Sequence, residues 1–229
     1  MRITRRCTTA FLAAATVALF AYGCDDDADE QQVPTEQQQQ THGEPLPEDF
    51  AGVDCVPGDR EQSDSEAEAL LYGVVSVPVD SEQKPVGSAE VTLAKTGEHG
   101  TYETAIATSD TDDEGRWCFQ LGADRPGAES LMVASTVDDT KLRRLVSSEG
   151  RLAIDARSEA LVQFLVDEGH QLHRLDPDQF ERLDELSVEV TSDVQPREGA
   201  GVDSLVARMR ETLESTPDVV ELSDTLFEE

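Results

Sequence analysis

The sequence predicts an α+β protein in which an antiparallel β-sandwich is followed by a small α-helical region. Between residues 70 and 147, apolar residues alternate with polar ones in short runs, which is typical of strands with one buried face. From Asp155 onward, apolar residues recur at helical spacing instead. Turn-rich pieces separate the alternating runs, as expected of an antiparallel sandwich: 80–84, 97–100, 110–115 and 122–127.

Six strands are expected in the first part. In chain order they are Leu70–Val79, Ala89–Ala94, Thr101–Ser109, Arg116–Leu121, Ser130–Val137 and Leu142–Ser147. Alternation in the fourth run directs Trp117, Phe119 and Leu121 to one side and Cys118 to the other. The expected core consists of Val91, Leu93, Ile106, Trp117, Phe119 and Leu121.

Three helices are expected in the second part. The first lies between Asp155, which suits an N-cap, and Gly169, which suits the C-terminal end. The second begins at Pro177 and runs toward Val190, and the third covers 202–215 and ends before Pro217. Their apolar faces predict packing on each other or on the sandwich, with a separate surface for a partner as the alternative.

The first 23 residues are typical of a bacterial export signal. Three arginines precede an uncharged run, Cys7–Gly23, and acidic residues follow Cys24. The segment Ala21–Cys24 resembles a bacterial lipobox, although Tyr22 is bulkier than usual there. The resemblance implies lipidation of Cys24 and a chain anchored to a membrane of the bacterial cell envelope, on its periplasmic or cell-surface side. Simple secretion or an uncleaved anchor is the alternative, but the run is shorter than the roughly 20 residues of a span.

Composition divides the chain after residue 23 into three parts. Residues 24–67 are acidic and rich in Gln and Pro, which predicts a disordered tether because they contain few large apolar residues. Residues 68–150 form the expected β part, and residues 151–229 form the helical region.

The charge balance excludes one class of partner. Without the three arginines of the signal, 15 of the 18 Lys and Arg residues remain against 49 Asp and Glu residues. Nucleic-acid binding depends on neutralising phosphates with Lys and Arg, so no nucleic acid is expected as a partner.

Two cysteines remain for structure. Cys55 and Cys118 are expected to form a disulfide in an oxidising envelope, with two buried thiols as the alternative. Neither belongs to a CxxC pair, so we expect no metal on them.

Three segments of the β part resemble the carboxypeptidase regulatory-like domain. They are Gly73–Val75, Pro85–Leu93 and Thr111–Phe119, within a resemblance that covers 69–137. The resemblance implies a transthyretin-like, Ig-like β-sandwich that is grouped with carbohydrate-binding-like folds. It also implies a structural or binding role, sometimes toward glycans, because the chain has no HxxE zinc motif.

No catalytic residue, metal or cofactor is expected. The segment 110–115 begins like an EF-hand, but Leu121 stands where a bidentate Glu is required, so an ordinary turn is expected. Tyr72 and Tyr102 are the candidates for exposed rings that stack on a ligand, whereas Trp117 is expected in the core.

These observations predict a non-enzymatic, membrane-anchored envelope lipoprotein that serves as a structural or binding module. A glycan-binding module is the first alternative, and it requires an exposed aromatic pair on one sheet face or rim. A divergent hydrolase is the second, and it requires His170 and His173 to meet acids such as Asp176 in a cleft. Expected partners are the membrane, a glycan or another envelope protein.

Overall fold

The computed structural model describes residues 46–58, 69–79, 82–121, 131–146, 150–175 and 177–227. All of them belong to one compact unit, Gln40–Glu229. The expected export signal, the lipidation site Cys24 and most of the tether lie outside the described residues. None of the described helices combines the length and hydrophobicity that a membrane span requires.

The first sheet is built around β2 (Ala69–Val79). This strand pairs antiparallel with β6 (Arg116–Leu121) and β3 (Glu82–Pro85), and parallel with β9 (Gly150–Ile154). The short strand β1 (Val56–Pro57) pairs parallel with β6 at the edge. The sheet is therefore mixed, whereas the sequence predicts antiparallel strands only.

A glycine allows β2 and β9 to approach closely. Gly73 lies opposite Leu152, and a Cβ atom added to Gly73 would lie 1.8 Å from the backbone oxygen of Leu152. No other residue fits at this position without moving one of the two strands.

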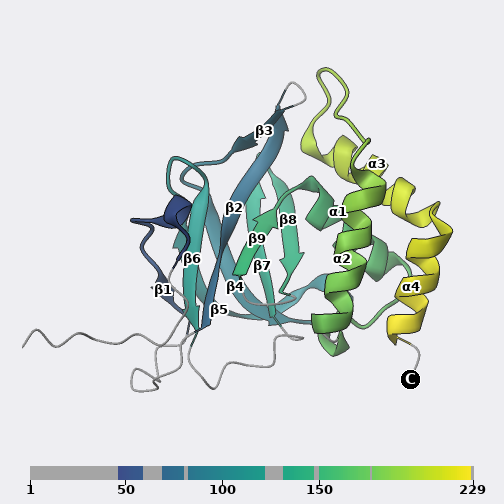
Figure 1. Cartoon of the computed structure of the whole chain (residues 1–229), viewed down its shortest axis with the longest axis horizontal. Helices are drawn as coiled ribbons and strands as arrows, with labels where there is room; N and C mark the ends of the chain where they lie inside the picture. The colour runs from purple at the N-terminus through teal and green to yellow at the C-terminus, as the bar shows by residue number, and fades with distance from the viewer. Residues whose placement is uncertain are drawn as a thin grey trace, which may run out of the picture. The chain divides into compact units, whose positions relative to one another are not determined.

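The second sheet has four antiparallel strands in the order β5-β4-β7-β8. They are β4 (Glu90–Thr96), β5 (Tyr102–Asp110), β7 (Leu131–Val137) and β8 (Thr140–Leu145). Figure 1 shows this sheet between the first sheet and the helices.

One hydrophobic cluster contains inward-pointing side chains of both sheets. The predicted core is largely confirmed, because Val91, Leu93, Trp117, Phe119 and Leu121 are buried there. Ile106 is only half-buried against the cluster, since it lies on the edge strand β5.

Four α-helices are present among the described residues: α1 (Ala156–Asp167), α2 (Pro177–Thr191), α3 (Val202–Glu214) and α4 (Pro217–Phe227). They share a second cluster with Met132 and Leu145 of the second sheet, and they gather on one side of the molecule (Figure 1). The predicted N-cap is confirmed, because Asp155 accepts a hydrogen bond from the Ser158 amide at 2.8 Å. The protein is thus α+β with antiparallel-rich sheets, as the sequence predicts at this level.

Three elements differ from the expectation. The region expected to be helical from residue 151 begins with strand β9, because these residues pair with β2 far away in the sequence. Strand β3 occupies most of the expected turn 80–84. Pro217 begins α4 instead of following the last helix, as the missing amide of proline suits a first helical turn.

Part of the expected tether is packed on the first sheet. Residues 46–58 include the short 3₁₀ helix η1 (Glu48–Phe50), and Phe50 is fully buried with its ring 4.9 Å from that of Tyr72. A disulfide joins Cys55 to Cys118 of β6, in agreement with the predicted pairing. These residues therefore belong to the folded unit, because the Phe50 ring and the disulfide attach them.

Candidate ligand-binding groove

A groove of about 470 Å³ lies on the outer face of the first sheet. Its floor consists of outward-pointing residues, namely Val74 and Ser76 of β2, Pro85 of β3 and Ala153 of β9. Their neighbours Val75 and Ile154 point into the core, so strand alternation alone exposes a small, mostly apolar floor.

The segment 46–58 closes one end of the groove. Asp49 and Phe50 form this end wall, since η1 covers Tyr72 and leaves the neighbouring part of the sheet open. The wall is therefore built by residues that precede the first long strand.

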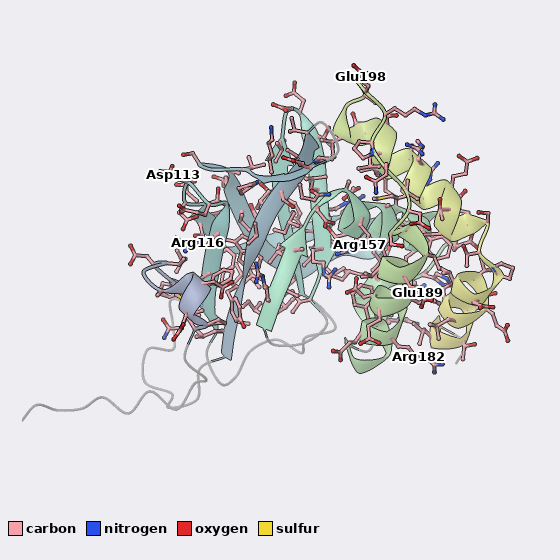
Figure 2. The ribbon with its side chains drawn as sticks, turned by 45° about the horizontal axis from the view of Figure 1, so that its top comes forward. Asp113, Arg116, Arg157, Arg182, Glu189 and Glu198 are labelled. Atoms are coloured by element: carbon pink, nitrogen blue, oxygen red, sulfur yellow. A yellow bond between two sulfur atoms is a disulfide. The ribbon has the colours of Figure 1, made fainter. Side chains whose placement is uncertain are left out.

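Arg116 is held rigidly at the side of the groove. Its Nε donates to Asp112 Oδ2 at 2.6 Å, its Nη1 to the Asp49 carbonyl at 2.7 Å and its Nη2 to Glu114 Oε2 at 3.2 Å. Figure 2 shows this side chain on the sheet, far from Arg182 and Glu189 on α2. Three partners fix the guanidinium plane before any ligand arrives.

The turn that carries Arg116 folds as the sequence predicts. Asp112 Oδ1 accepts from the amides of Glu114 and Arg116 at 3.0 and 2.8 Å, and Gly115 has φ +72°. Burial alone would raise the pKa of the Asp112 carboxyl, but the hydrogen bonds and the charge of Arg116, with the Glu114 amide, outweigh it and lower that pKa.

Arg151 faces the groove from β9. Its Nη1 donates to Asp49 Oδ2 at 2.9 Å, and its guanidinium carbon lies 5.4 Å from the centre of the Phe50 ring. The side chain is 59% exposed, so much of the guanidinium is accessible to a ligand. With Asp49 and Glu114, the two arginines give the groove lining two positive and two negative charges.

The two candidate stacking residues do not form an exposed pair. Tyr72 lies in the first sheet against Phe50, whereas Tyr102 lies in the second sheet with Lys141 Nζ 4.1 Å from its ring centre. The aromatic pair that a glycan-binding surface requires is therefore not made by these two residues.

The two histidines of the hydrolase alternative follow α1 and do not line the groove. His170 is half-buried, and burial lowers its pKa although Asp224 and Glu168 act in the opposite direction. His173 lies in the 3₁₀ helix η4 (Leu172–Arg174), and Asp176 is outside the described residues. Within the described part of the chain, no group of three or more His, Cys, Asp or Glu side chains could hold a metal ion.

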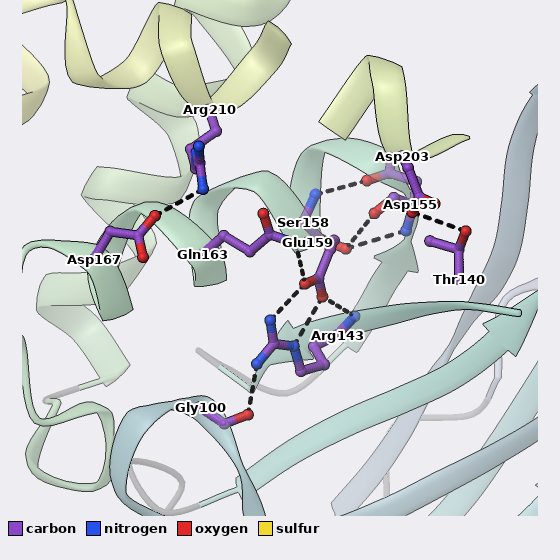
Figure 3. Close-up of polar contacts among 10 residues, drawn as sticks. All are labelled: Gly100, Thr140, Arg143, Asp155, Ser158, Glu159, Gln163, Asp167, Asp203 and Arg210. Atoms are coloured by element: carbon purple, nitrogen blue, oxygen red, sulfur yellow. Dashed lines mark hydrogen bonds and ion pairs between the residues drawn. The ribbon is translucent and has the colours of Figure 1, made fainter. Parts of the chain in front are cut away.

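A buried polar network lies between the second sheet and α1 (Figure 3). Glu159 accepts from the backbone amide and Nε of Arg143, both at 2.9 Å, and from Gln163 at 2.8 Å. Arg143 also donates to the Gly100 carbonyl at 2.7 Å. Every contact in this network is internal, so it fastens the helix to the sheet.

Sequence reasoning did not identify the residues that line this groove. Asp49 was assigned to the tether, and Arg116 and Arg151 stand 67 and 102 residues away from it. The available signal was an arginine at an outward position of an alternating strand, in a chain that has only 18 basic residues.

Comparison with known proteins finds similarity at the level of solved structures. No protein-family model matches the chain, and no curated protein matches it. Catechol 1,2-dioxygenase from Acinetobacter sp. ADP1 has 16% identity and a TM-score of 0.28, over 45% of this chain and 48% of that chain. An intradiol ring-cleavage dioxygenase from Tetranychus urticae has 10% identity and a TM-score of 0.27, over 41% and 56%. The chain spans about half the length of these structures, and TM-scores this low transfer neither activity nor substrate to it.

These comparisons correct the expected family. The resemblance to the carboxypeptidase regulatory-like domain, with its transthyretin-like and carbohydrate-binding-like labels, is wrong, because the similar structures are intradiol dioxygenases. No family model supports the lipoprotein assignment either. The resemblance failed because it was based on turn residues and alternation, which many small β folds share.

The expected function is corrected by the same finding. The non-enzymatic envelope module, with its glycan-binding and hydrolase alternatives, is overturned because these neighbours are ring-cleavage enzymes. Dioxygen chemistry in proteins is carried by haem, flavin, copper or non-haem iron. The described residues lack a cluster of His, Cys, Asp or Glu that would fit a metal, so we derive no oxygenation step.

Proposed function

We propose that the groove beside Arg116 and Arg151 binds a small, planar, uncharged organic molecule. The observation that carries the proposal is an apolar floor bordered by two guanidinium groups that both donate hydrogen bonds to Asp49. Pockets for small molecules typically combine apolar walls with a few fixed polar groups.

The preference for a flat molecule follows from the arginines. A guanidinium plane stacks on an aromatic or other planar face, and the sheet floor below is lined by short side chains. The carboxylates of Asp49 and Glu114 supply acceptors for hydroxyl or amide donors at the rim of such a molecule.

The preference for an uncharged molecule follows from the charge balance. The two arginines are matched by two carboxylates within the groove, so no net charge is offered to an ion there. The chain carries a net charge of −31, which repels anions at long range and holds cations over the whole surface rather than at one place.

The disulfide supports a proposal about where the chain acts. A cysteine pair that is oxidised in the folded protein is typical of extracytoplasmic proteins, which agrees with an export signal at the N-terminus. We therefore propose the bacterial cell envelope as its location. The core that both sheets share supports a β-sandwich as the finer description of the fold.

Three fragments of equal size test the ligand class. We would titrate the protein with benzamide, benzoate and benzamidine, and follow backbone amide resonances. Benzamide is expected to shift the resonances of Val74, Ala153 and Arg151 with a Kd of about 1 mM, the usual range for fragments this small. Benzoate is expected to bind more weakly. Benzamidine is expected to shift the amide resonances of acidic surface residues throughout the chain rather than those of the groove alone. The proposal fails if benzamide leaves the groove resonances unchanged.

A pair of variants locates the binding. Arg151→Ala is expected to weaken benzamide binding about fivefold, the loss of about 1 kcal/mol of stacking. Arg182→Ala removes an arginine that lines a separate acidic groove between α2 and α4, and it is expected to leave benzamide binding unchanged. Equal effects of the two substitutions would contradict the assignment to this groove.

A further inference from the structure

The end wall of the groove is attached to the domain through few contacts. Within the described residues, β1 pairs with β6 at only two positions, and the Gly58 amide donates to the Gln120 carbonyl at 2.7 Å. The ion pair between Asp49 and Arg151 is more than half exposed on both sides, so it adds little. Further attachments of this segment are the Phe50 ring, the Arg116 contact, the packing of Val56 against the shared core of the sheets, and the disulfide.

The disulfide lies where it controls the wall. Cys55 is five residues after Phe50 and six after Asp49, and its partner Cys118 is two residues after Arg116 on β6. The bond therefore holds the wall residues beside the arginine that borders the groove. Cys118 is fully buried, whereas Cys55 is half-buried.

The two hydrophobic clusters do not depend on this wall. Phe50 belongs to neither cluster, and Val56 is the one residue of 46–58 that packs against the shared core of the sheets. We therefore expect that release of residues 46–58 removes β1 and the Val56 contact but leaves the rest of the two clusters packed.

We propose that oxidation of Cys55 and Cys118 assembles the groove, so that the chain gains its binding site only in an oxidising compartment. The ligand part of this inference rests on the proposed function, whereas the assembly of the wall does not. Before export the reduced chain folds its two clusters but leaves Asp49 and Phe50 unfixed. The disulfide would therefore make ligand binding depend on the compartment in which the chain resides.

The chemical step is thiol–disulfide exchange with an oxidised dithiol protein. The thiolate of one cysteine attacks the disulfide of the oxidant and forms a mixed disulfide. The thiolate of the second cysteine then attacks the sulfur of the first cysteine in the mixed disulfide. This closes the bond between Cys55 and Cys118 and releases the oxidant's sulfur as a thiolate. Two electrons pass to the oxidant, which leaves as a dithiol, and the two thiol protons are transferred with them.

Hydrogen exchange of the full chain tests the wall without any ligand. We would compare the oxidised protein, the protein reduced with dithiothreitol, and the double variant Cys55→Ser/Cys118→Ser by mass spectrometry. Peptides from residues 46–58 are expected to exchange about tenfold faster in the last two, as local opening becomes easier. Peptides from α1 and β7 are expected to keep their protection. Unchanged exchange in 46–58, or exchange that rises equally throughout the domain, would overturn the inference.

A second variant separates the disulfide from the aromatic contact. Phe50→Ala with the disulfide intact is expected to retain the protection of the Gly58 amide, because Cys55 still fastens the segment. If this variant releases residues 46–58 as fully as reduction does, the disulfide alone does not hold the wall, and the inference is wrong.

Benzamide titration of the oxidised and reduced chains completes the test. We expect benzamide to bind the oxidised form, and we expect reduction to weaken its affinity about fivefold or more, on the same stacking estimate as for Arg151→Ala. Equal binding to both forms would contradict a groove assembled by oxidation. Absence of binding to the oxidised form would reject the proposed ligand class, and the exchange experiment would still decide whether oxidation fixes the wall.

Discussion

Glu159 of α1 accepts hydrogen bonds from both the backbone amide and the side chain of Arg143 in β8. The carboxylate side chain is 2% exposed and the guanidinium side chain is 15% exposed, so water screens this pair weakly. The pair joins the helical layer to the second sheet (Figure 3).

Glu159→Ala is expected to destabilise the protein by about 3–5 kcal/mol, since it leaves a buried guanidinium without its carboxylate. The free energy of unfolding in urea measures the effect. Glu214→Ala is the matched control, because Glu214 pairs with Arg210 at the surface and its removal is expected to cost at most about 1 kcal/mol. Similar losses for the two variants would contradict the structural role of Glu159.

Gly115→Ala is expected to be more destabilising than Gly169→Ala. Both glycines have positive φ, which costs an alanine about 1–2 kcal/mol. At Gly115 the added Cβ would also lie 2.7 Å from the Val75 carbonyl oxygen, whereas at Gly169 nothing lies within 4 Å. Thermal unfolding of the two variants measures the difference, and equal melting temperatures would show that the close contact is relieved without cost.

Asp112 is expected to titrate below the ordinary carboxyl pKa of 3.8, because Arg116 stabilises its ionised form more than burial opposes it. Its contribution to stability is therefore full above pH 3.8 and is lost as the pH falls through the lowered pKa. Carbon-detected NMR titration of the carboxyl gives the pKa directly. Asp112→Asn should flatten the acid side of the stability profile, and an unchanged profile would contradict this role of Asp112.

His170 gives a pH dependence in a different window. Burial lowers its pKa from 6.5, so the folded state resists the proton that the unfolded state accepts. Stability is expected to be full above about pH 6.5 and to fall as the pH decreases through the lowered pKa. His170→Gln should remove this slope in urea unfolding between these values. A slope that persists in His170→Gln would assign it to another group.

Local patterns predicted the parts of the fold that depend on neighbouring residues. Alternation in 116–121 assigned Trp117 to the core and Cys118 to the outer face, and the cap at Asp155 was read directly from its residue type. The side-chain directions in this strand and the helix cap each depend on a few neighbouring residues, so the sequence alone predicts them.

The parts that were missed depend on distant residues. Five residues of β9 form a strand because β2 offers them a parallel partner, and no pattern within 150–154 contains that information. The same holds for the groove, where Asp49 meets Arg116 and Arg151 only after the first sheet has formed.

The parallel pairing of β9 with β2 across Gly73 has a consequence for synthesis on the ribosome. Strand β2 is synthesised early, yet its edge at residues 71–75 has no partner until residue 154 has emerged from the exit tunnel. Closure over so many intervening residues slows folding. The first sheet is thus completed only after about two thirds of the 229 residues have been synthesised.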